Sequence, residues 1–364
     1  MRILVFRPGQ LGDVLVALPA LQAIRSHFKD ARIILLSDRQ QGKSWVVGKD
    51  ILDGTGLVDG FESYTVFDKR VTRIRIFLER ARLWLKVREG GFDAVVYLAP
   101  SLRKPRQVIR DKVFFRSAGI QQLLGFSGFP FPRRPSDSGF LAREPHEAEL
   151  LLRRITQSGI KEGTATFRLP IPNPRQMRAR CWIERQTNAH GKTWIAVCPG
   201  SKMPVKIWPE ERFAEVVHHL IADFDIWPVV FGSIEEKVLA ERLVTVWRRG
   251  TIASGQLGIQ DGIEVMKRCR LFLGNDTGAM HMAVVAGIQC VSIFSARAPE
   301  GSWYPYGQGH VVFRKKVRCE GCMLNRCVKE EMKCILSISV DEVYEGCRAL
   351  LESQCKAQNE CGIH

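Results

Sequence analysis

Three short segments of this 364-residue chain place charged side chains beside glycines, each directly after a hydrophobic run. The first segment, Pro8–Asp13, follows the run Arg2–Phe6 and opens an amphipathic stretch. Asp13 is a candidate general base, because a carboxylate at the end of a parallel strand lies where ligands bind such sheets. An N-cap aspartate that only stabilises a helix is the alternative. The segment has neither the dinucleotide glycine fingerprint nor a P-loop lysine, so it predicts neither a nicotinamide nor an ATP site.

The second segment, Pro199–Pro209, follows the run Trp194–Cys198 and contains three polar or basic side chains. Ser201, Lys202 and Lys206 at the carboxyl end of a strand are suited to the oxygens of a diphosphate, with lysine as a compact positive charge. Pro209 is expected to begin the next helix, where its missing N–H has no consequence. A purely structural loop is the alternative.

The third segment, Leu271–His281, runs from a strand through small and polar residues into a helix of small residues. Backbone N–H groups at such a helix start, together with the helix dipole, bind phosphate. Asp276 and His281 are expected to face the ligand if the helix begins near Thr277. A buried structural histidine is the alternative for His281.

Four cysteines lie within sixteen residues near the end of the chain: Cys319, Cys322, Cys327 and Cys334. Their spacing fits a tetrahedral thiolate site for structural zinc or iron. Reduced thiols and a disulfide pair are the alternatives, and the disulfide is disfavoured because the chain shows no secretory signal. The later Cys347, Cys355 and Cys361 are expected to be packing or surface thiols.

The elements that must position these segments follow a regular alternation. Short β-branched runs alternate with amphipathic stretches, the pattern of βαβ units in parallel sheets. We expect strands at Arg2–Phe6, Arg32–Leu36, Ala94–Leu98, Trp194–Cys198, Trp227–Phe231, Leu271–Gly274 and Cys290–Phe294. We expect helices at Asp13–Phe28, Glu210–Ala222, Glu235–Arg248, Gly262–Arg268, Ala279–Ala286 and Val340–Leu351.

The prolines of residues 169–174 interrupt this alternation and predict a linker. The sequence therefore predicts an α/β protein of two doubly wound, Rossmann-like domains, residues 1–172 and 173–339, the second with a Cys-rich loop at 317–335. A helix and tail follow at 340–364. Ligands are expected at the carboxyl ends of the two sheets, in a cleft between the domains.

The net charge of +16 is unevenly placed. Residues 1–172 hold 29 Lys and Arg against 17 Asp and Glu, and the run Lys69–Arg116 holds 14 against 4. Such a run attracts an anionic membrane surface or a phosphorylated acceptor, and a solvated basic helix is the alternative. No helix-turn-helix, RNP motif or zinc finger is recognisable, so no nucleic-acid partner is expected. With no run of about 18 apolar residues and no signal peptide, we expect a cytoplasmic protein, peripheral at the inner leaflet of the inner membrane if it binds lipid.

In this order the three segments resemble the lipopolysaccharide heptosyltransferases, glycosyltransferase family 9. The resemblance rests on Gly12-Asp13 with Ala17–Leu21, on Pro199-Gly200-Ser201 with Lys206-x-Trp208-Pro209, and on Gly274–Gly278 with His281. Weaker similarity at Tyr97–Ser101, Phe231–Ser233 and Trp303-x-Pro305 extends it over nearly the whole chain.

The resemblance implies a GT-B fold, an ADP-heptose donor in the second domain, an acceptor in the first, and inversion at the anomeric carbon without a catalytic metal. It assigns Asp13 as general base and Lys206 as the charge that stabilises the departing diphosphate. The donor-binding set would be Ser201, Lys202, Phe231, Gly232, Ser233, Asp276, Thr277, Gly278 and His281. The acceptor-binding set, on charge and position, would be Gln10, Ser101, Arg103, Lys104 and Arg106.

The function so implied is transfer of heptose to a lipopolysaccharide core or a related anionic glycolipid. Transfer of another nucleotide-activated sugar and transfer of heptose to a protein, as in autotransporter heptosyltransferases, are the alternatives. The Cys cluster departs from the general family pattern but recurs in some relatives. A nucleotide-sugar epimerase of GT-B type is a further alternative; it would need a second acid or base carboxylate, and the sequence shows none beside Asp13.

Overall fold

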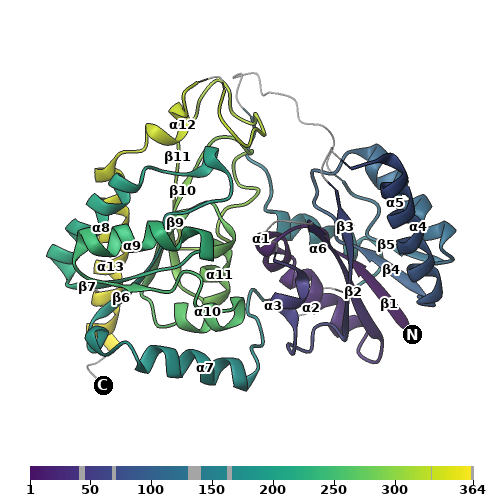
Figure 1. The fold of residues 1–364 in the computed structure, drawn as a ribbon, viewed down its shortest axis with the longest axis horizontal. Helices are drawn as coiled ribbons and strands as arrows, with labels where there is room; N and C mark the ends of the chain where they lie inside the picture. The colour runs from purple at the N-terminus through teal and green to yellow at the C-terminus, as the bar shows by residue number, and fades with distance from the viewer. Residues whose placement is uncertain (41–45, 68–70, 130–140, 162–165, 329, 362–364) are drawn as a thin grey trace. The chain divides into compact units, whose positions relative to one another are not determined.

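A computed structural model describes residues 1–40, 46–67, 71–129, 141–161, 166–328 and 330–361. Within this part the chain forms two compact units, which are described separately: Met1–Pro132 with Pro145–Pro170, and Arg133–Glu144 with Ile171–His364, each without the gaps just given (Figure 1). No helix among the described residues is long and apolar enough to cross a membrane.

Unit 1 is built on a parallel sheet with the strand order β3-β2-β1-β4-β5. The strands are β1 (Arg2–Phe6), β2 (Arg32–Gln40), β3 (Gly60–Val66), β4 (Ala94–Tyr97) and β5 (Gln122–Leu124). The helices are α1 (Leu11–Val16), α2 (Leu18–His27), α3 (Gly48–Leu52), α4 (Arg73–Glu89), α5 (Pro105–Ser117) and α6 (Glu147–Thr156).

Alternating side chains of the central strands give unit 1 a core on each face of its sheet. Leu4 and Phe6 of β1 lie in one cluster with Val95 and Tyr97 of β4, and α4 and α5 cover this face through Val87, Phe115 and their neighbours. Ile3 and Val5 point to the opposite face and are fully buried as well. Burial on both faces is typical of parallel sheets covered by crossover helices.

Unit 2 contains a second parallel sheet, with the order β11-β10-β9-β6-β7-β8. Its strands are β6 (Thr193–Cys198), β7 (Ile226–Val230), β8 (Thr251–Ile252), β9 (Leu271–Asn275), β10 (Gln289–Phe294) and β11 (Val311–Arg314). Its α-helices are α7 (Asn173–Glu184), α8 (Glu210–Phe224), α9 (Lys237–Trp247), α10 (Ile259–Met266), α11 (Gly278–Ala286), α12 (Lys333–Leu336) and α13 (Val340–Cys361). Three 3-10 turns complete it: η1 (Thr187–Ala189), η2 (Pro204–Lys206) and η3 (Ile234–Glu236).

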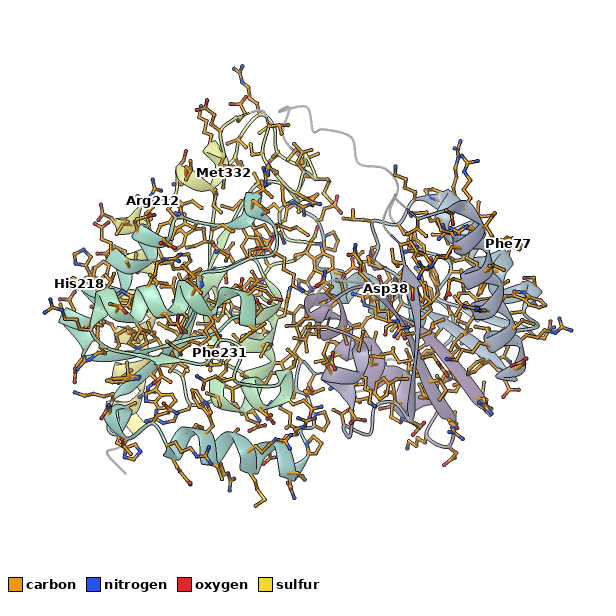
Figure 2. The ribbon with its side chains drawn as sticks, in the orientation of Figure 1. Asp38, Phe77, Arg212, His218, Phe231 and Met332 are labelled. Carbon is orange, nitrogen blue, oxygen red and sulfur yellow. The ribbon has the colours of Figure 1, made fainter. Side chains whose placement is uncertain are left out.

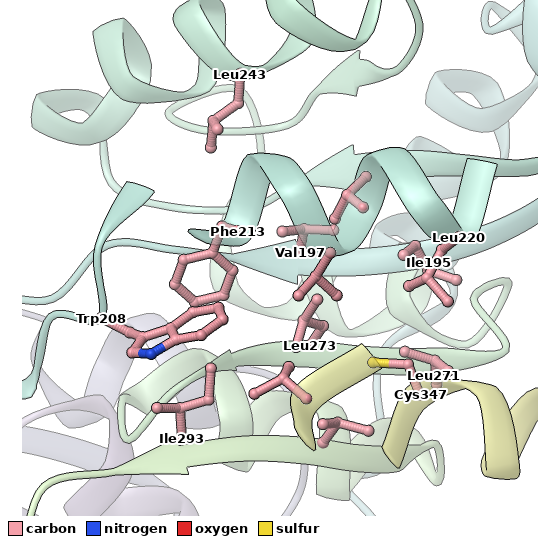
Figure 3. Packing of buried hydrophobic residues seen from close by; sticks show 14 of the residues in the cluster. Ile195, Val197, Trp208, Phe213, Leu220, Leu243, Leu271, Leu273, Ile293 and Cys347 are labelled. Carbon is pink, nitrogen blue, oxygen red and sulfur yellow. The ribbon is translucent and has the colours of Figure 1, made fainter. Parts of the chain in front are cut away.

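The main core of unit 2 joins β6, β9 and β10 to the helices α8, α9 and α13 (Figure 3). Trp208 is fully buried in this cluster, and its ring packs edge-on against Phe213 with the centroids 5.0 Å apart. The Trp208 indole N–H also donates to the carbonyl of Ile338 at 3.1 Å. The large side chain that follows the Lys206 turn is thus anchored in the core.

The expected α/β class and parallel sheets are confirmed, and several predicted elements have other bounds. The last helix, expected to end at Leu351, continues to Cys361. The helix expected at Asp13–Phe28 is two helices that meet at Ala17, because Pro19 in the first turn of α2 cannot continue the hydrogen bonding of α1. The second strand extends four residues beyond Leu36, to Gln40. The helix expected at Gly262–Arg268 begins at Ile259 and ends at Met266.

Candidate active site

In each unit the candidate residues lie where the strand order reverses. In unit 1 the chain leads from β1 to β2 and β3 on one side and to β4 and β5 on the other, so β1 and β4 flank the reversal. In unit 2 the equivalent strands are β6 and β9. Loops at the carboxyl ends of such strand pairs diverge and leave the space in which doubly wound sheets bind ligands. The loops here carry Asp13 and Ser101 in unit 1, and Lys206 and Asp276 in unit 2.

Asp13 sits in the first turn of α1 and is held by the backbone around it. Its Oδ2 accepts the N–H of Gln10 at 2.9 Å. Gln10 is the N-cap and Asp13 the third residue of the helix, so Asp13 stabilises the helix start through a capping box and is not the N-cap that the structural alternative expected. Its side chain is still 28% exposed, so the carboxylate also reaches solvent. The capping bond fixes the direction of the carboxylate and leaves oxygen lone pairs for a substrate hydroxyl.

Arg7 supports this turn from the interior. Its guanidinium is fully buried and donates to the carbonyls of Asp13 and Leu98, so it ties the loop after β1 to the loop after β4. Its nearest contact with the Asp13 carboxylate is 3.8 Å. Burial lowers the pKa of Arg7, and the charges of Asp13, Glu147 and Asp38 oppose that shift.

Gly9 makes room for the carboxylate. Its φ of +124° lies in a region that side chains rarely adopt, and a Cβ at this position would lie 2.3 Å from Cγ of Asp13. A residue other than glycine would strain the backbone and also displace the candidate base.

Asp38 is a second carboxylate that the sequence did not reveal. It lies near the end of β2, is mostly buried, and accepts the Gly9 N–H at 2.6 Å (Figure 2). Burial raises the pKa of Asp38, the Gly9 N–H lowers it, and the charge of Asp13 raises it further. The expectation that no second carboxylate lies beside Asp13 is therefore wrong.

The expected acceptor residues divide into two kinds. Ser101 is buried and its N–H donates to Glu147 at 2.9 Å, while the guanidinium of Arg103 is bound to Asp111 at 2.6 and 3.1 Å. Ser101 is therefore held through its backbone, and Arg103 through its side chain. Lys104 and Arg106, at the start of α5, are exposed.

In unit 2, Lys206 and Asp276 form a close ion pair. Nζ of Lys206 lies 2.7 Å from Oδ2 of Asp276, and both side chains are mostly buried. The pair joins the loop after β6 to the loop after β9. It fixes the lysine charge at the reversal of the sheet, where a diphosphate would compete with Asp276 for it.

Asn275 fastens the Lys206 loop to the sheet. Its fully buried amide donates to the carbonyl of Pro199 at 2.7 Å and accepts the N–H of Trp208 at 3.2 Å. One side chain thus binds both ends of the segment 199–208. The spacing Lys206-x-Trp208 combines a charge at the site with an anchor in the core.

The helix α11 begins at Gly278 with Thr277 as its N-cap, one residue before the expected start. Its first turn holds no acidic residue, so the free N–H groups and the dipole favour an anion. Thr277 Oγ1 lies 4.0 Å from Sγ of Cys198, whose pKa burial raises to about 12. His281 is buried beside Trp303, with the ring centroids 6.3 Å apart.

The remaining donor candidates surround a glutamate that the sequence analysis missed. Glu236 Oε2 accepts the N–H of Ser233 at 2.7 Å, and added Cβ atoms on Gly200 and Gly232 would lie 2.0 and 2.9 Å from its carboxylate oxygens. Burial lowers the pKa of Lys202, whereas Glu235 and Glu236 oppose that shift. The glutamate therefore lies among the loops that contain Ser201, Lys202 and Phe231–Ser233. The spacing Ser233-x-x-Glu236, a capping box, was the signal available in the sequence.

The chain was compared with known protein families and solved structures. Residues 163–333, which include both loops of the unit 2 site, match the family model described as glycosyltransferase family 9 (heptosyltransferase). Over this segment, just under half of its length, the chain is similar to glycosyltransferase family 9, and it is a glycosyltransferase.

Full-length relatives agree with this similarity. Lipooligosaccharide heptosyltransferase 2 of Campylobacter jejuni subsp. jejuni serotype O:2 is 24% identical over 365 residues, 97% of this chain and 99% of the relative. The solved family 9 glycosyltransferase of Veillonella parvula DSM 2008 has a TM-score of 0.69 at 19% identity, over 97% of both chains. E. coli ADP-heptose lps heptosyltransferase II has a TM-score of 0.65 at 16% identity, over 97% of this chain and 99% of that one. These structures confirm the predicted GT-B fold.

The Cys-rich loop of the chain lies next to the Lys206 loop. The carbonyl of Asn325 accepts the N–H of Val205 at 3.3 Å, and Arg297 donates to the carbonyls of Met323 and Leu324. Burial raises the pKa of the Cys334 thiol, and the electrostatic influence of Cys319, Cys327 and Cys322 raises it further. Across the described residues, no three His, Cys, Asp or Glu side chains stand in a metal-binding arrangement.

A cavity of about 240 Å³ lies elsewhere in unit 1, among Arg2, Arg32, Phe61, Lys86 and Phe92. It opens beside α4 near the amino ends of β1 and β2. Because parallel sheets bind ligands at their carboxyl ends, it is not part of the candidate site.

Proposed function

We propose that this chain transfers heptose from ADP-heptose to a lipopolysaccharide core or a closely related acceptor, with inversion at the anomeric carbon. The observation that carries the proposal is the ion pair of Lys206 and Asp276, placed beside the start of α11 at the reversal of the unit 2 sheet. Full-length similarity to a lipooligosaccharide heptosyltransferase 2 supports heptose as the sugar.

Asp13 accepts the proton of the acceptor hydroxyl as that oxygen attacks the anomeric carbon. The bond from this carbon to the diphosphate breaks, its electrons leave with ADP, and the new glycosidic bond forms on the opposite face of the sugar. Lys206 and the N–H groups at the start of α11 stabilise the negative charge that grows on the diphosphate. This division of roles uses no catalytic metal.

The remaining unit 2 residues bind the donor. Ser201 and Lys202 hold phosphate oxygens, and Phe231, Gly232 and Ser233 line the pocket for the nucleotide. Glu236 accepts hydrogen bonds from hydroxyl groups of the donor, since an ionised carboxylate has only acceptors to offer. Asp276, Thr277, Gly278 and His281 position the phosphates and the sugar.

The acceptor is an anionic glycolipid presented at a membrane surface. Gln10, Lys104 and Arg106 lie on or near the loops of the unit 1 site, and exposed cations there attract phosphate or carboxylate groups. Ser101 and Arg103 shape this site through their contacts with Glu147 and Asp111. The excess of positive charge in the first 172 residues favours an anionic surface.

The test begins with the donor. Purified protein is incubated with ADP-heptose, UDP-sugars and GDP-sugars, with and without an acyl-free core acceptor, and the products are identified. Heptosylated acceptor and ADP are expected from ADP-heptose. An isomerised sugar nucleotide as the product would replace the transferase with an epimerase, and transfer from a UDP- or GDP-sugar would replace the donor.

The base is tested by Asp13→Asn, which should lower kcat by about a hundredfold or more while donor affinity stays unchanged. Asp30→Asn, an exposed carboxylate of the same unit, is the control and should retain full activity. Unchanged kcat in Asp13→Asn would exclude this residue as the base.

We propose further that Cys319, Cys322, Cys327 and Cys334 hold a structural zinc or iron ion. Four cysteines within sixteen residues supply a donor set that both metals accept, and binding would require their thiols to draw together from the arrangement described above. Elemental analysis of the purified protein should find about one metal per chain, lost in Cys319→Ser and kept in Cys181→Ser. A metal-free wild-type protein purified without chelator would reject this site.

A further inference from the structure

Helix α4 presents an apolar stripe to solvent. Ile74, Phe77, Leu78 and Leu85 are between 49% and 73% exposed, and Phe77 is labelled at the outer edge of unit 1 in Figure 2. With Ala81 they follow spacings of three, one, three and four residues, which place all five on one face of the helix. Contiguous exposed apolar side chains of this size usually mark a binding surface.

The stripe is not the face that packs on the sheet. Val87 is the only residue of α4 that is buried. Leu83 and Trp84 are partly buried and pack beside it on the core of unit 1. At about 100° per residue, Leu83 and Val87 point away from Ile74 and Leu78. The helix is therefore apolar on two sides, and the exposed side has no packing partner among the described residues of unit 1.

Arginines border the stripe on both sides. The helical rotation places Arg73 and Arg80 on one flank, and Arg75 and Arg82 on the other. The long aliphatic parts of arginine lie along apolar surface while the guanidinium reaches polar groups. An apolar stripe between two rows of cations is the pattern of a helix that lies in a membrane interface.

The adjacent helix α5 also exposes both apolar and basic side chains. Ile109 and Val113 are each 62% exposed and lie one turn apart. Trp84 of α4 donates its indole N–H to Ser117 of α5 at 3.0 Å, and the two helices lie together on one face of the unit 1 sheet (Figure 1). The exposed basic residues of α5 are Arg106, Arg110, Lys112 and Arg116.

We propose that α4 docks unit 1 onto an anionic lipid bilayer, with Ile74, Phe77 and Leu78 inserted between the headgroups and the flanking arginines bound to lipid phosphates. This inference deepens the proposed function: the docked helix would bring the enzyme to a lipid-borne acceptor only if the chain transfers sugar to a glycolipid. A second copy of the chain fits less well, because pairing α4 with α4 would bring two sets of like charges together. The lipid surface offers apolar depth and negative charge at once.

The experiment is sedimentation with vesicles, using the intact chain. Wild-type protein should bind vesicles of phosphatidylglycerol mixed with phosphatidylcholine, and should not bind phosphatidylcholine alone. The triple variant Ile74→Ser, Phe77→Ser, Leu78→Ser should lose binding on the order of tenfold or more, since each side chain contributes its buried apolar area. The pair Arg73→Gln, Arg80→Gln should weaken binding and reduce its salt dependence.

The matched control is the pair Val238→Ser, Val246→Ser, which removes similarly exposed apolar side chains from α9 in unit 2. It should bind vesicles like the wild type. The triple variant should also keep wild-type transfer to an acyl-free, water-soluble acceptor, because the three side chains face solvent and belong to none of the elements that carry Asp13, Lys206 or Asp276. Wild-type protein that binds the anionic vesicles but transfers no sugar to the soluble acceptor would count against the proposed function and leave the docking helix standing.

Three results would overturn the docking proposal. Wild-type protein that fails to bind the anionic vesicles excludes it, as does a triple variant that binds as tightly as the wild type. Concentration-dependent dimers in sedimentation velocity that the triple variant abolishes would assign the stripe to a second copy of the chain instead.

Discussion

Lys206 Nζ lies 2.7 Å from Asp276 Oδ2, and the two residues come from the loops that follow the adjacent strands β6 and β9. The ion pair holds the lysine charge before a donor arrives. A buried pair of this kind is costly to break by removing one partner, because the other is left as an uncompensated charge. Stability therefore depends on both members of the pair, whereas stabilisation of the departing diphosphate depends on the charge of Lys206.

A double-mutant cycle separates these demands. Lys206→Met should lower the unfolding free energy by about 3 kcal/mol and kcat by about a hundredfold. Adding Asp276→Asn should recover much of the stability, since the orphaned carboxylate is gone, but none of the activity. Urea unfolding and steady-state kinetics on the four proteins measure both quantities.

The control for this cycle is Lys192→Met, which breaks the more exposed pair with Asp225. Its unfolding midpoint and its kcat should stay close to those of the wild type. Recovery of activity in the double variant would show that Lys206 acts only through Asp276.

Gly9→Ala tests whether the backbone of the first loop positions the base. The new methyl group would occupy the space of the Asp13 carboxylate, so kcat should fall by about tenfold or more at unchanged donor affinity. Gly159→Ala is the matched control, because Gly159 has a φ of +90° but no neighbouring atom within 4 Å of the added Cβ. Equal loss of kcat in both variants would attribute the effect to general backbone strain.

The predicted elements have local causes, whereas strands such as β3, β8 and β11 were not predicted. The strands Ile226–Val230 and Leu271–Asn275 consist largely of buried apolar residues, so their positions follow from composition. The glycine-containing loops after them were also recognisable. Even the break between α1 and α2 had a signal, Pro19, although the continuous apolar pattern obscured it.

Asp38 and Glu236 could not be found in this way. Asp38 reaches the site only because β2 pairs beside β1, and the strand was expected to end at Leu36, which left this carboxylate in a loop. Glu236 had the local capping-box signal Ser233-x-x-Glu236, but its approach to Gly200, in the loop after β6, depends on the pairing of β6 with β7. Contacts that arise from sheet pairing carry no local pattern, so single-sequence reasoning misses them.

Asp38 should make stability depend on pH. Burial raises the pKa of Asp38, so the folded state binds its proton more tightly than the unfolded chain. Between the pKa of the unfolded chain, about 4, and the raised pKa of the folded state, Asp38 stays protonated in the folded protein but ionises in the unfolded chain. The unfolding free energy therefore falls as the pH rises across this interval. Asp38→Asn lacks this loss.

The measurement is urea unfolding of wild type and Asp38→Asn over a series from about pH 4 to pH 7. The difference in unfolding free energy should shift in favour of the asparagine variant as pH rises, and then level off. A difference that does not change with pH would mean that Asp38 ionises in the folded protein as in the unfolded chain.

Asn275→Ala tests whether the donor loop depends on its attachment to the sheet. The substitution leaves the Pro199 carbonyl and the Trp208 N–H without their buried partner, so the unfolding free energy should fall by about 1–3 kcal/mol. The segment 199–208 should then exchange its amide hydrogens faster, and KM for ADP-heptose should rise because Lys206 is held less firmly. Thr251→Ala removes the partner of the Trp227 indole N–H at the far edge of the same sheet and should leave KM unchanged. A destabilised Asn275→Ala with wild-type KM would show that the loop keeps its donor geometry through the burial of Trp208 alone.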